Sequence, residues 1–328
     1  MPAEDAGWLC DRAARGPTPF PACLGRSAKP RGQVCYNPRK TLRRRMAIDV
    51  RPSPIAGTWY PGSSAALAES VDRQLAEAEV APPEGQILAL LAPHAGHIYS
   101  GQVAAQAFRC LDGLAPEVVC VVSPLHQLHA GQVLTTAHEA YATPLGEVPV
   151  DRSLVDRFAQ ALADQADIRL ERVRRDREHA LEIELPFLQR VLTTPFRLLP
   201  VMLRDQNRVT IEACGHALAS ALAGVPAILV ASSDLSHFFP APVAGRLDAE
   251  LLARVEAFDP AAVLAAEEEG VGFACGRGAI AAVLWAARDL GANRVRLLGY
   301  ATSGDVTGDD TSVVGYGAAV VYRSATAG

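Results

Sequence analysis

Four side chains that could bind a metal ion or transfer protons follow three short apolar runs of the sequence. Each run is expected to be a buried strand, and the runs are Ile87–Ala92, Val118–Val122 and Ala227–Ala231. The side chains that follow them are His94, His126, Asp234 and His237. Imidazole and carboxylate groups can both bind metal ions or move protons. If the strands are parallel neighbours, all four side chains open into one crevice at their carboxyl ends, where open α/β sheets bind ligands.

Each of these residues also has an ordinary structural explanation. A histidine after a strand is often a loop or capping residue, and Asp234 could simply accept hydrogen bonds from the backbone of a turn. Pro93 before His94 and Gly96 after it would form a tight turn that presents the imidazole. The residues alone therefore leave both interpretations open, although their repeated placement at strand ends favours a site.

Cys275 lies in the glycine-rich segment Phe273–Gly278, directly before an expected helix at Ala279–Leu290. The positive end of that helix and the neighbouring Arg277 would both favour the thiolate form of the side chain. A thiolate is either a nucleophile or a soft metal ligand. The alternative is a buried small apolar side chain, which is the usual place of a free cysteine.

Glu178 and His179 begin a segment, Glu178–Leu192, that is expected to be helical despite Pro186 inside it. Glu178 and Glu182 are four residues apart and would share one face of that helix. A carboxylate beside a histidine could orient a metal ligand. The simpler interpretation, which we prefer from the sequence, is an acidic first turn that complements the helix dipole.

The rest of the sequence alternates between strand and helix patterns. Further strands are expected at Phe196–Leu203, Val295–Tyr300 and Val313–Tyr322. Further helices are expected at Gly101–Cys110, Ser153–Ala163, Val209–Leu222, Val243–Ala257 and Pro260–Glu268. This alternation predicts an α/β fold in which helices flank a mostly parallel or mixed central sheet. No linker interrupts residues 46–328, which are expected to form a single domain.

Residues 1–45 differ from the rest in composition. They contain six prolines and four glycines, and ten Lys and Arg against three Asp and Glu. This predicts a disordered basic leader or a start site placed too early, with a nucleic-acid-binding or targeting arm as the alternative. Because the whole chain has a net charge of −5, the remaining residues carry −12. An acidic body argues against a nucleic-acid partner, since phosphate contacts need clustered basic side chains.

The sequence also argues against a membrane protein. No apolar run reaches the roughly 20 residues that a transmembrane helix needs, and the N-terminus lacks the apolar region of a signal peptide. The seven cysteines have no spacing typical of a disulfide framework. Reduced thiols and a cytoplasmic location are therefore expected.

Seven short motifs, in this order, resemble those of the Memo family, also called AmmeMemoRadiSam system protein B. They are Trp59-Tyr60-Pro61, Ala92-Pro93-His94-Ala95-Gly96, Thr143-Pro144-Leu145-Gly146, Glu178-His179 through Leu185-Pro186, Ser232-Ser233-Asp234, Cys275-Gly276-Arg277 and Gly315-Tyr316. Each motif is weak alone, but their order and spacing are specific. The resemblance covers roughly residues 50–323.

The resemblance implies the fold of the class III (LigB-type) extradiol dioxygenases, which bind non-haem iron through two histidines and a carboxylate. In Memo proteins a cysteine takes the place of the carboxylate. Carried over to this chain, the metal ligands would be His94, His126 and Cys275, and Asp234 and His237 would line the pocket as catalytic residues. Iron(II) is the expected metal, with copper or zinc as alternatives.

Family members in bacteria are often encoded near a radical-SAM protein and an AMMECR-type protein, which the resemblance implies as possible partners. The substrate, expected to be a small molecule, is not identified by the sequence. Two functions remain open: a redox enzyme related to the dioxygenases, or a non-catalytic iron- or copper-binding or interaction protein. One departure bears on the site, because the family frequently has two consecutive histidines where this chain has His126 and Gln127.

Overall fold

Four of the apolar runs form adjacent parallel strands at the centre of the main sheet. The computed structural model describes residues 48–324. Across the sheet the four strands are, in order, β2 (Gln86–Ala92), β9 (Ala227–Ser232), β3 (Val118–Pro124) and β8 (Arg197–Leu203). Nearly all of their residues are buried. Helices cover both faces of such a sheet, which is why these strands are apolar throughout rather than in alternate positions.

Antiparallel strands extend the sheet at both sides, so the sheet is mixed, in agreement with the sequence-based prediction. Beside β2, β12 (Val313–Arg323) pairs with β10 (His237–Phe239) and β11 (Arg294–Thr302). Beside β8 lie β4 (Val133–Thr136) and β7 (Leu170–Val173). Within residues 48–324 this sheet has nine strands. A separate small sheet contains β1 (Val50–Arg51), β5 (Ala140–Thr143) and β6 (Gly146–Pro149).

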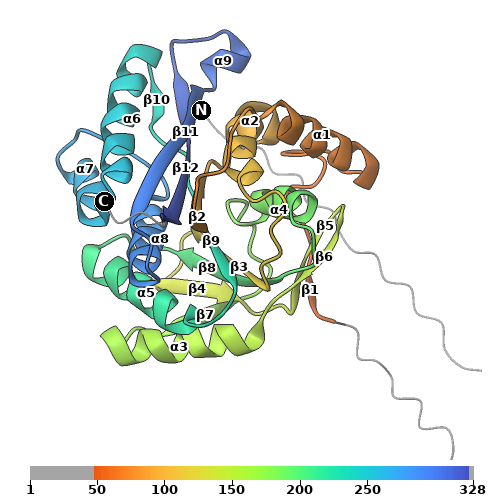
Figure 1. Cartoon of the computed structure of the whole chain (residues 1–328), viewed down its shortest axis with the longest axis vertical. Helices are drawn as coiled ribbons and strands as arrows, with labels where there is room; N and C mark the ends of the chain where they lie inside the picture. The colour runs from red at the N-terminus through yellow and green to blue at the C-terminus, as the bar shows by residue number, and fades with distance from the viewer. Residues whose placement is uncertain (1–47, 325–328) are drawn as a thin grey trace, which may run out of the picture. The chain divides into compact units, whose positions relative to one another are not determined.

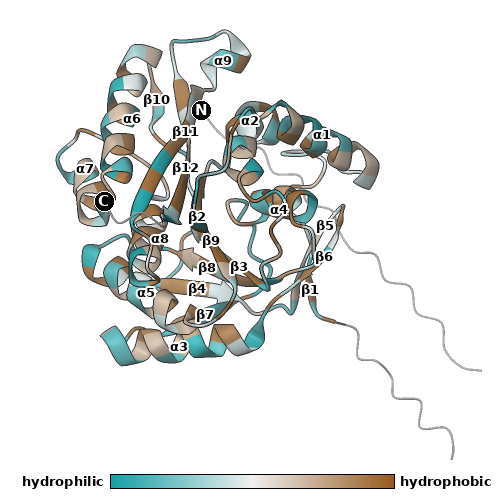
Figure 2. Cartoon of the chain, in the orientation of Figure 1, coloured by the Kyte–Doolittle hydropathy of each residue, from teal (hydrophilic) through white to brown (hydrophobic). Residues whose placement is uncertain are grey.

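Helices lie on both sides of the main sheet (Figure 1). On one side are α1 (Ser64–Glu77), α2 (His97–Arg109) and α4 (Leu185–Val191); on the other are α5 (Arg208–Leu222), α6 (Ala241–Glu256), α7 (Pro260–Glu268) and α8 (Arg277–Asp289). α3 (Arg152–Ala166) packs on α5, and α9 (Gly304–Thr307) is a single turn after β11. Figure 2 shows the central strands coloured as hydrophobic, whereas the helices mix polar and apolar colours. The pattern is that of amphipathic helices packed on an apolar sheet.

The helix expected over Glu178–Leu192 is shorter than predicted. A 3₁₀ turn spans Glu182–Glu184 and α4 follows at Leu185–Val191. Glu178 lies before both, and its carboxylate accepts hydrogen bonds from the N–H groups of His179 (2.9 Å) and Ala180 (3.0 Å). Such local side-chain bonds compete with helix formation. The interpretation of Glu178 as part of an acidic first helical turn is therefore wrong.

The described residues, 48–324, all belong to one compact unit. The leader predicted for residues 1–45 lies outside the described residues and stays a prediction. In the part of the chain that the structure describes, no helix combines the length and apolar character needed to cross a bilayer.

Candidate metal centre

A cavity of about 620 Å³ opens at the carboxyl ends of β2, β3 and β9. These three strands are parallel neighbours, which is the condition under which the sequence predicted a common crevice. The four strand-end residues named from the sequence all line the cavity: His94, His126, Asp234 and His237. His179 lines it as well.

Hydrogen bonds fix both the position and the tautomer of His94. The Asp234 carboxylate accepts bonds from the backbone N–H groups of His94 (2.7 Å) and Ala95 (3.2 Å), which holds the turn after β2. His94 Nδ1 lies 2.9 Å from Ser232 Oγ, whose own proton is donated to the carbonyl of Ala180 at 2.5 Å. Ser232 Oγ must therefore accept from Nδ1–H, and His94 Nε2 keeps a free lone pair.

A carboxylate holds His126 in the same tautomer. Glu178 Oε1 accepts from His126 Nδ1 at 2.9 Å, and Oε2 accepts from the His126 backbone N–H at 2.6 Å. A carboxylate on the far nitrogen is the usual support of a metal-binding histidine, because it fixes the ring and raises its basicity. The carboxylate–histidine interpretation that the sequence analysis ranked second is thus the one that the geometry favours, with His126 as the histidine.

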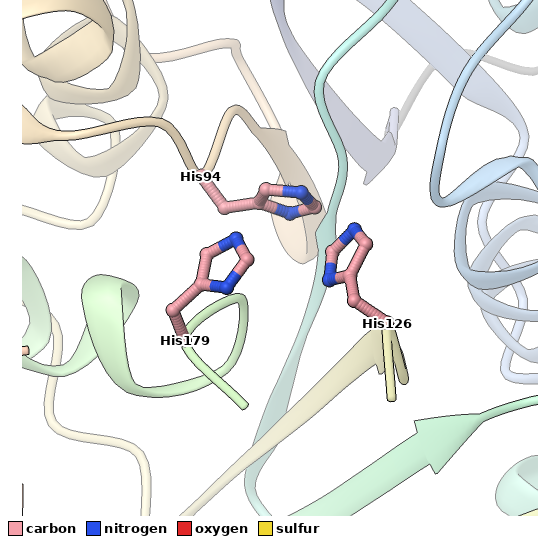
Figure 3. Close-up of side chains that lie close together, drawn as sticks. All are labelled: His94, His126 and His179. Carbon is pink, nitrogen blue, oxygen red and sulfur yellow. The ribbon is translucent and has the colours of Figure 1, made fainter. Parts of the chain in front are cut away.

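His179 joins these two histidines. The ligand atoms of His94, His126 and His179 all lie within 4.8 Å of one another. Figure 3 shows the three rings gathered together, with one nitrogen of His126 and one of His179 directed towards His94. The Trp59 ring packs against His179 at 4.1 Å between ring centroids. From the sequence, His179 was considered only as the neighbour of Glu178 and was not predicted as a site residue. The one sequence feature that could have identified it is the family motif that contains it.

The surroundings of the three histidines shift their pKa values in different directions. Burial holds the pKa of His94 well below its usual value, and the neighbouring His179 and His126 add to this shift. Burial likewise lowers the pKa of His179 to about 4. Burial also acts to lower the pKa of His126, but the hydrogen bond and the charge of Glu178 outweigh it and raise that pKa. His94 and His179 are therefore neutral near pH 7, and neutral imidazole is the form that binds metal ions.

Cys275 lies beside His94, in the turn before α8, but it is not part of the compact group that the three histidines form. Its Sγ lies 3.1 Å from His94 Nε2 and 3.6 Å from the carbonyl oxygen of Asp234. Cys275 also lines a smaller hollow of about 250 Å³, which it shares with His237. The sulfur thus sits in the wall behind His94 rather than in the open part of the cavity.

The expectation that Arg277 favours a Cys275 thiolate is wrong. Burial and the neighbouring Asp234 carboxylate raise the pKa of the thiol, despite hydrogen bonds that act in the other direction. Arg277 forms a 2.5 Å ion pair with Glu267 instead. Without a metal ion the side chain is a neutral thiol, and a bound cation would have to displace its proton.

Asp234 and His237 line the cavity close to His94 and Cys275. Burial raises the pKa of Asp234 to about 7, although the bonds from His94 and Ala95 oppose that shift. His237 Nδ1 donates to the carbonyl of Leu235 at 2.9 Å, so its Nε2 is free to accept a proton. Burial lowers the pKa of His237, which keeps the ring neutral. The structure therefore assigns Asp234 a clear part in holding the His94 turn, and leaves His237 available for proton transfer.

A buried arginine supports the loop that carries Glu178, and no sequence signal identified it. Arg51, 1% exposed, donates from Nη2 to the carbonyl of Glu178 at 2.6 Å. It also forms ion pairs with Asp176 (2.7 Å) and Glu182 (2.5 Å). Glu182 Oε1 accepts in turn from the Tyr60 hydroxyl at 2.6 Å. This network ties Arg51 of β1 and Tyr60, the neighbour of Trp59, to the loop that carries Glu178 and His179.

Gln127, where the family frequently has a second histidine, has a different task here. With its amide oriented so that the oxygen faces the donors, the side chain accepts from the backbone N–H groups of Arg177 (2.8 Å) and Glu178 (3.0 Å). It therefore helps to hold the loop behind His126 and does not point its side chain at the His94 ring. The departure at position 127 leaves the arrangement of His94 and His126 intact.

Comparison with known proteins agrees with the resemblance. The family model described as Memo-like protein matches residues 51–320. A MEMO1 family protein of Nitrosopumilus maritimus is 33% identical over 274 residues, which cover 82% of this chain and 98% of the relative. A MEMO1 family protein of Methanothermobacter thermautotrophicus is 36% identical over 278 residues, with 81% and 98% covered. One of Aeropyrum pernix is 35% identical over 284 residues, with 82% and 98% covered. Since the family model spans most of the chain and relatives match it nearly end to end, the chain belongs to the Memo family.

Proposed function

We propose that this Memo-family protein binds one metal ion through His94, His126 and Cys275 and uses it in redox chemistry on a small molecule in the cavity. The observation that carries the proposal is the matched tautomer of the two histidines. Ser232 and Glu178 each occupy an Nδ1–H, so in both rings Nε2 is the nitrogen left for a metal ion, and the Nε2 of His94 lies 3.1 Å from Cys275 Sγ. The buried Glu178 carboxylate, with its lowered pKa, supplies negative charge that would offset the charge of a cation, and a bound cation would favour the ionised form of Asp234 as well.

Either Cys275 or His179 could be the third ligand beside His94 and His126. Typical metal–sulfur and metal–nitrogen bonds at a tetrahedral angle place the two donor atoms about 3.5 Å apart. The Cys275 Sγ to His94 Nε2 distance of 3.1 Å is close to that value. His179 is the alternative, because it belongs to the compact histidine group. We favour Cys275 because a thiolate contributes charge as well as a lone pair, which leaves His179 to face an open position of the ion.

Two imidazoles and a thiolate form a softer donor set than two imidazoles and a carboxylate. Iron(II) is our first expectation, and copper or zinc would also fit such a set. When bound, iron or copper would supply one-electron chemistry at an open coordination position. The chain's own contribution would be positional: His237 Nε2 could take or return a proton at the cavity wall, and Asp234 would keep His94 in place.

Metal analysis of protein purified without air tests the ligand set. The variants His94→Ala, His126→Ala, Cys275→Ser and His179→Ala are compared with His216→Ala, whose exposed side chain pairs with Asp289 away from the cavity. We expect one metal ion per chain in the parent and in His216→Ala, and a loss of tenfold or more in affinity for His94→Ala, His126→Ala and Cys275→Ser. If Cys275→Ser keeps its full metal content and His179→Ala loses metal, the third ligand is His179 and not Cys275.

Oxygen uptake separates an enzyme from a binding protein. The redox-enzyme proposal expects iron(II)-loaded protein to consume dioxygen when a small substrate such as a catechol is supplied, and His237→Gln to slow that consumption. The second candidate function, metal binding without turnover, is favoured by the thiolate donor, which suits copper(I). Tight copper(I) binding with no dioxygen uptake from any catechol would support it. The radical-SAM and AMMECR-type partners implied by the family would then be tested as recipients of the metal.

A further inference from the structure

Phe238 has a backbone conformation that large L-residues rarely adopt. Its φ is 63°, in the left-handed region. β10 pairs with β12 through His237 and Phe239, and the register shifts between these two residues. Phe238 is therefore the extra residue of a β-bulge. Bulges next to functional sites often serve to redirect a side chain.

Burial of the ring does not offset the cost of this conformation, because the Phe238 side chain is 76% exposed. The bulge places the ring at the cavity that holds the three histidines, since Phe238 is among its lining residues. The neighbouring ring of His237 lies 5.6 Å away in an edge-to-face arrangement. An unfavourable backbone, an exposed aromatic ring and a position at the cavity mouth together indicate a side chain held ready for a ligand.

Other apolar side chains complete the mouth of the cavity. Ile98 and Tyr99, in the first turn of α2, are 69% and 38% exposed and line the same cavity. Val314 and Trp59 add further apolar surface. The floor is polar by contrast, with the histidines and Asp234. The cavity thus has two chemically distinct ends, and its size suits a small molecule.

We propose that Phe238 is a specificity-determining residue that selects ligands with an apolar body behind an oxygen-donor head. The head would bind at the metal centre, so this inference rests on the proposed function, and the body would lie against Phe238, Ile98 and Tyr99. The ring is exposed in the free protein, so its contact with a ligand body removes apolar surface from water on both sides. The bulge conformation keeps the ring at the mouth before a ligand arrives, which lowers the ordering cost of binding.

Three hydroxamates that share one metal-binding head and differ in body test the proposal. They are acetohydroxamate, cyclohexanecarbohydroxamate and benzohydroxamate, titrated calorimetrically into metal-loaded protein. We expect the two larger compounds to bind about tenfold or more tighter than acetohydroxamate, from the apolar area that they bury. In Phe238→Ala most of that preference is lost while acetohydroxamate binds as before. Val209→Ala, which shortens an exposed side chain on α5, keeps the full preference.

Phe238→Gly adds a readout that does not depend on ligand. Glycine adopts φ of 63° without strain, whereas alanine does not. We therefore expect Phe238→Gly to melt at a higher temperature than Phe238→Ala, although both lose the preference for larger bodies. If the glycine variant is no more stable than the alanine variant, the bulge is unstrained and the proposal loses its structural basis.

Metal content, measured first, separates this inference from the proposed function. Protein that takes up no metal overturns the metal centre, and the same three hydroxamates are then compared on metal-free protein by saturation-transfer NMR. A Phe238-dependent preference for the larger bodies there would still support the role of Phe238. The role of Phe238 would be overturned if Phe238→Ala, with normal metal content, prefers the larger hydroxamates as strongly as the parent does. It would also be overturned if the parent shows no preference for the larger hydroxamates.

Discussion

Replacement of Glu178 by glutamine is the change whose consequences the structure defines most sharply. The carboxylate accepts four N–H groups: the ring Nδ1 and the backbone of His126, and the backbones of His179 and Ala180. Glutamine has the same shape, but it offers one acceptor oxygen and an NH₂ group that would face a donor. At least one buried N–H is left unpaired, and the charge-assisted character of the bonds is lost.

The pKa of Glu178 gives the size of the effect. Burial alone would raise that pKa, but the hydrogen bonds and charge of His126 and the backbone donors lower it to about 2, from its usual value of 4.5. One pKa unit corresponds to about 1.4 kcal/mol, so the charged form contributes about 3 kcal/mol to the stability of the folded state. The group is 2% exposed, so solvent screening does not reduce this value much. Because the pKa is lowered in the folded protein, the contribution is complete above about pH 4.5 and disappears as the pH falls towards 2.

Urea denaturation of metal-free protein measures this contribution without linkage to metal binding. We expect Glu178→Gln to lower the free energy of unfolding by about 3 kcal/mol at pH 7, with the difference narrowing below about pH 4.5. The control is Glu212→Gln on α5, whose exposed carboxylate pairs with Arg208, and we expect a change below about 0.5 kcal/mol. Metal affinity of Glu178→Gln should fall about 10- to 100-fold, because the orientation of His126 is lost. A variant as stable as the parent, with the same metal affinity, would refute the role given to Glu178.

Three further predictions concern Arg51, Cys275 and Gly315. Arg51→Met should lower the free energy of unfolding by about 3–5 kcal/mol, since it leaves Glu182 and Asp176 buried without their partner, whereas Arg190→Met at an exposed pair with Asp72 should change it by less than about 1 kcal/mol. Metal affinity measured between pH 6 and 9 should rise about tenfold per pH unit, because the Cys275 thiol, with its raised pKa, loses a proton on binding. The rise should be steeper at pH values below the raised pKa of His126, because that ring must then also lose a proton to bind the metal. If, above that pKa, the affinity of Cys275→Ser rises with pH as steeply as the affinity of the parent, the thiol is excluded as a ligand. Gly315→Ala should destabilise the protein by about 1–3 kcal/mol in urea melts, because a Cβ there would clash with Asp248 Oδ2 and displace a carboxylate that accepts the N–H of Ser236. The control is Gly245→Ala in α6, where a Cβ meets no atom within 4 Å and should not destabilise the protein.

The sequence by itself determined the features that depend on neighbours along the chain. Continuous apolar runs identified β2, β3, β8 and β9, because strands buried on both faces need no polar positions. The polar residues directly after these runs could be assigned to one end of the sheet on the same ground. The ordered motifs identified the family, and with it the expectation of a metal centre.

Only the tertiary structure decided how the site is supported. Glu178 bonds His126 across 52 residues of sequence, and Arg51 meets Glu182 across 131. Neither contact leaves a periodic or compositional signal, because each depends on how separate loops pack above the sheet. For the same reason the local argument from Arg277 misjudged Cys275: a helix start and a nearby cation favour a thiolate, but Arg277 turns to Glu267 while burial beside Asp234 favours the neutral thiol. Protonation and orientation are set by everything that surrounds a group in space, and sequence neighbours are a small part of that surrounding.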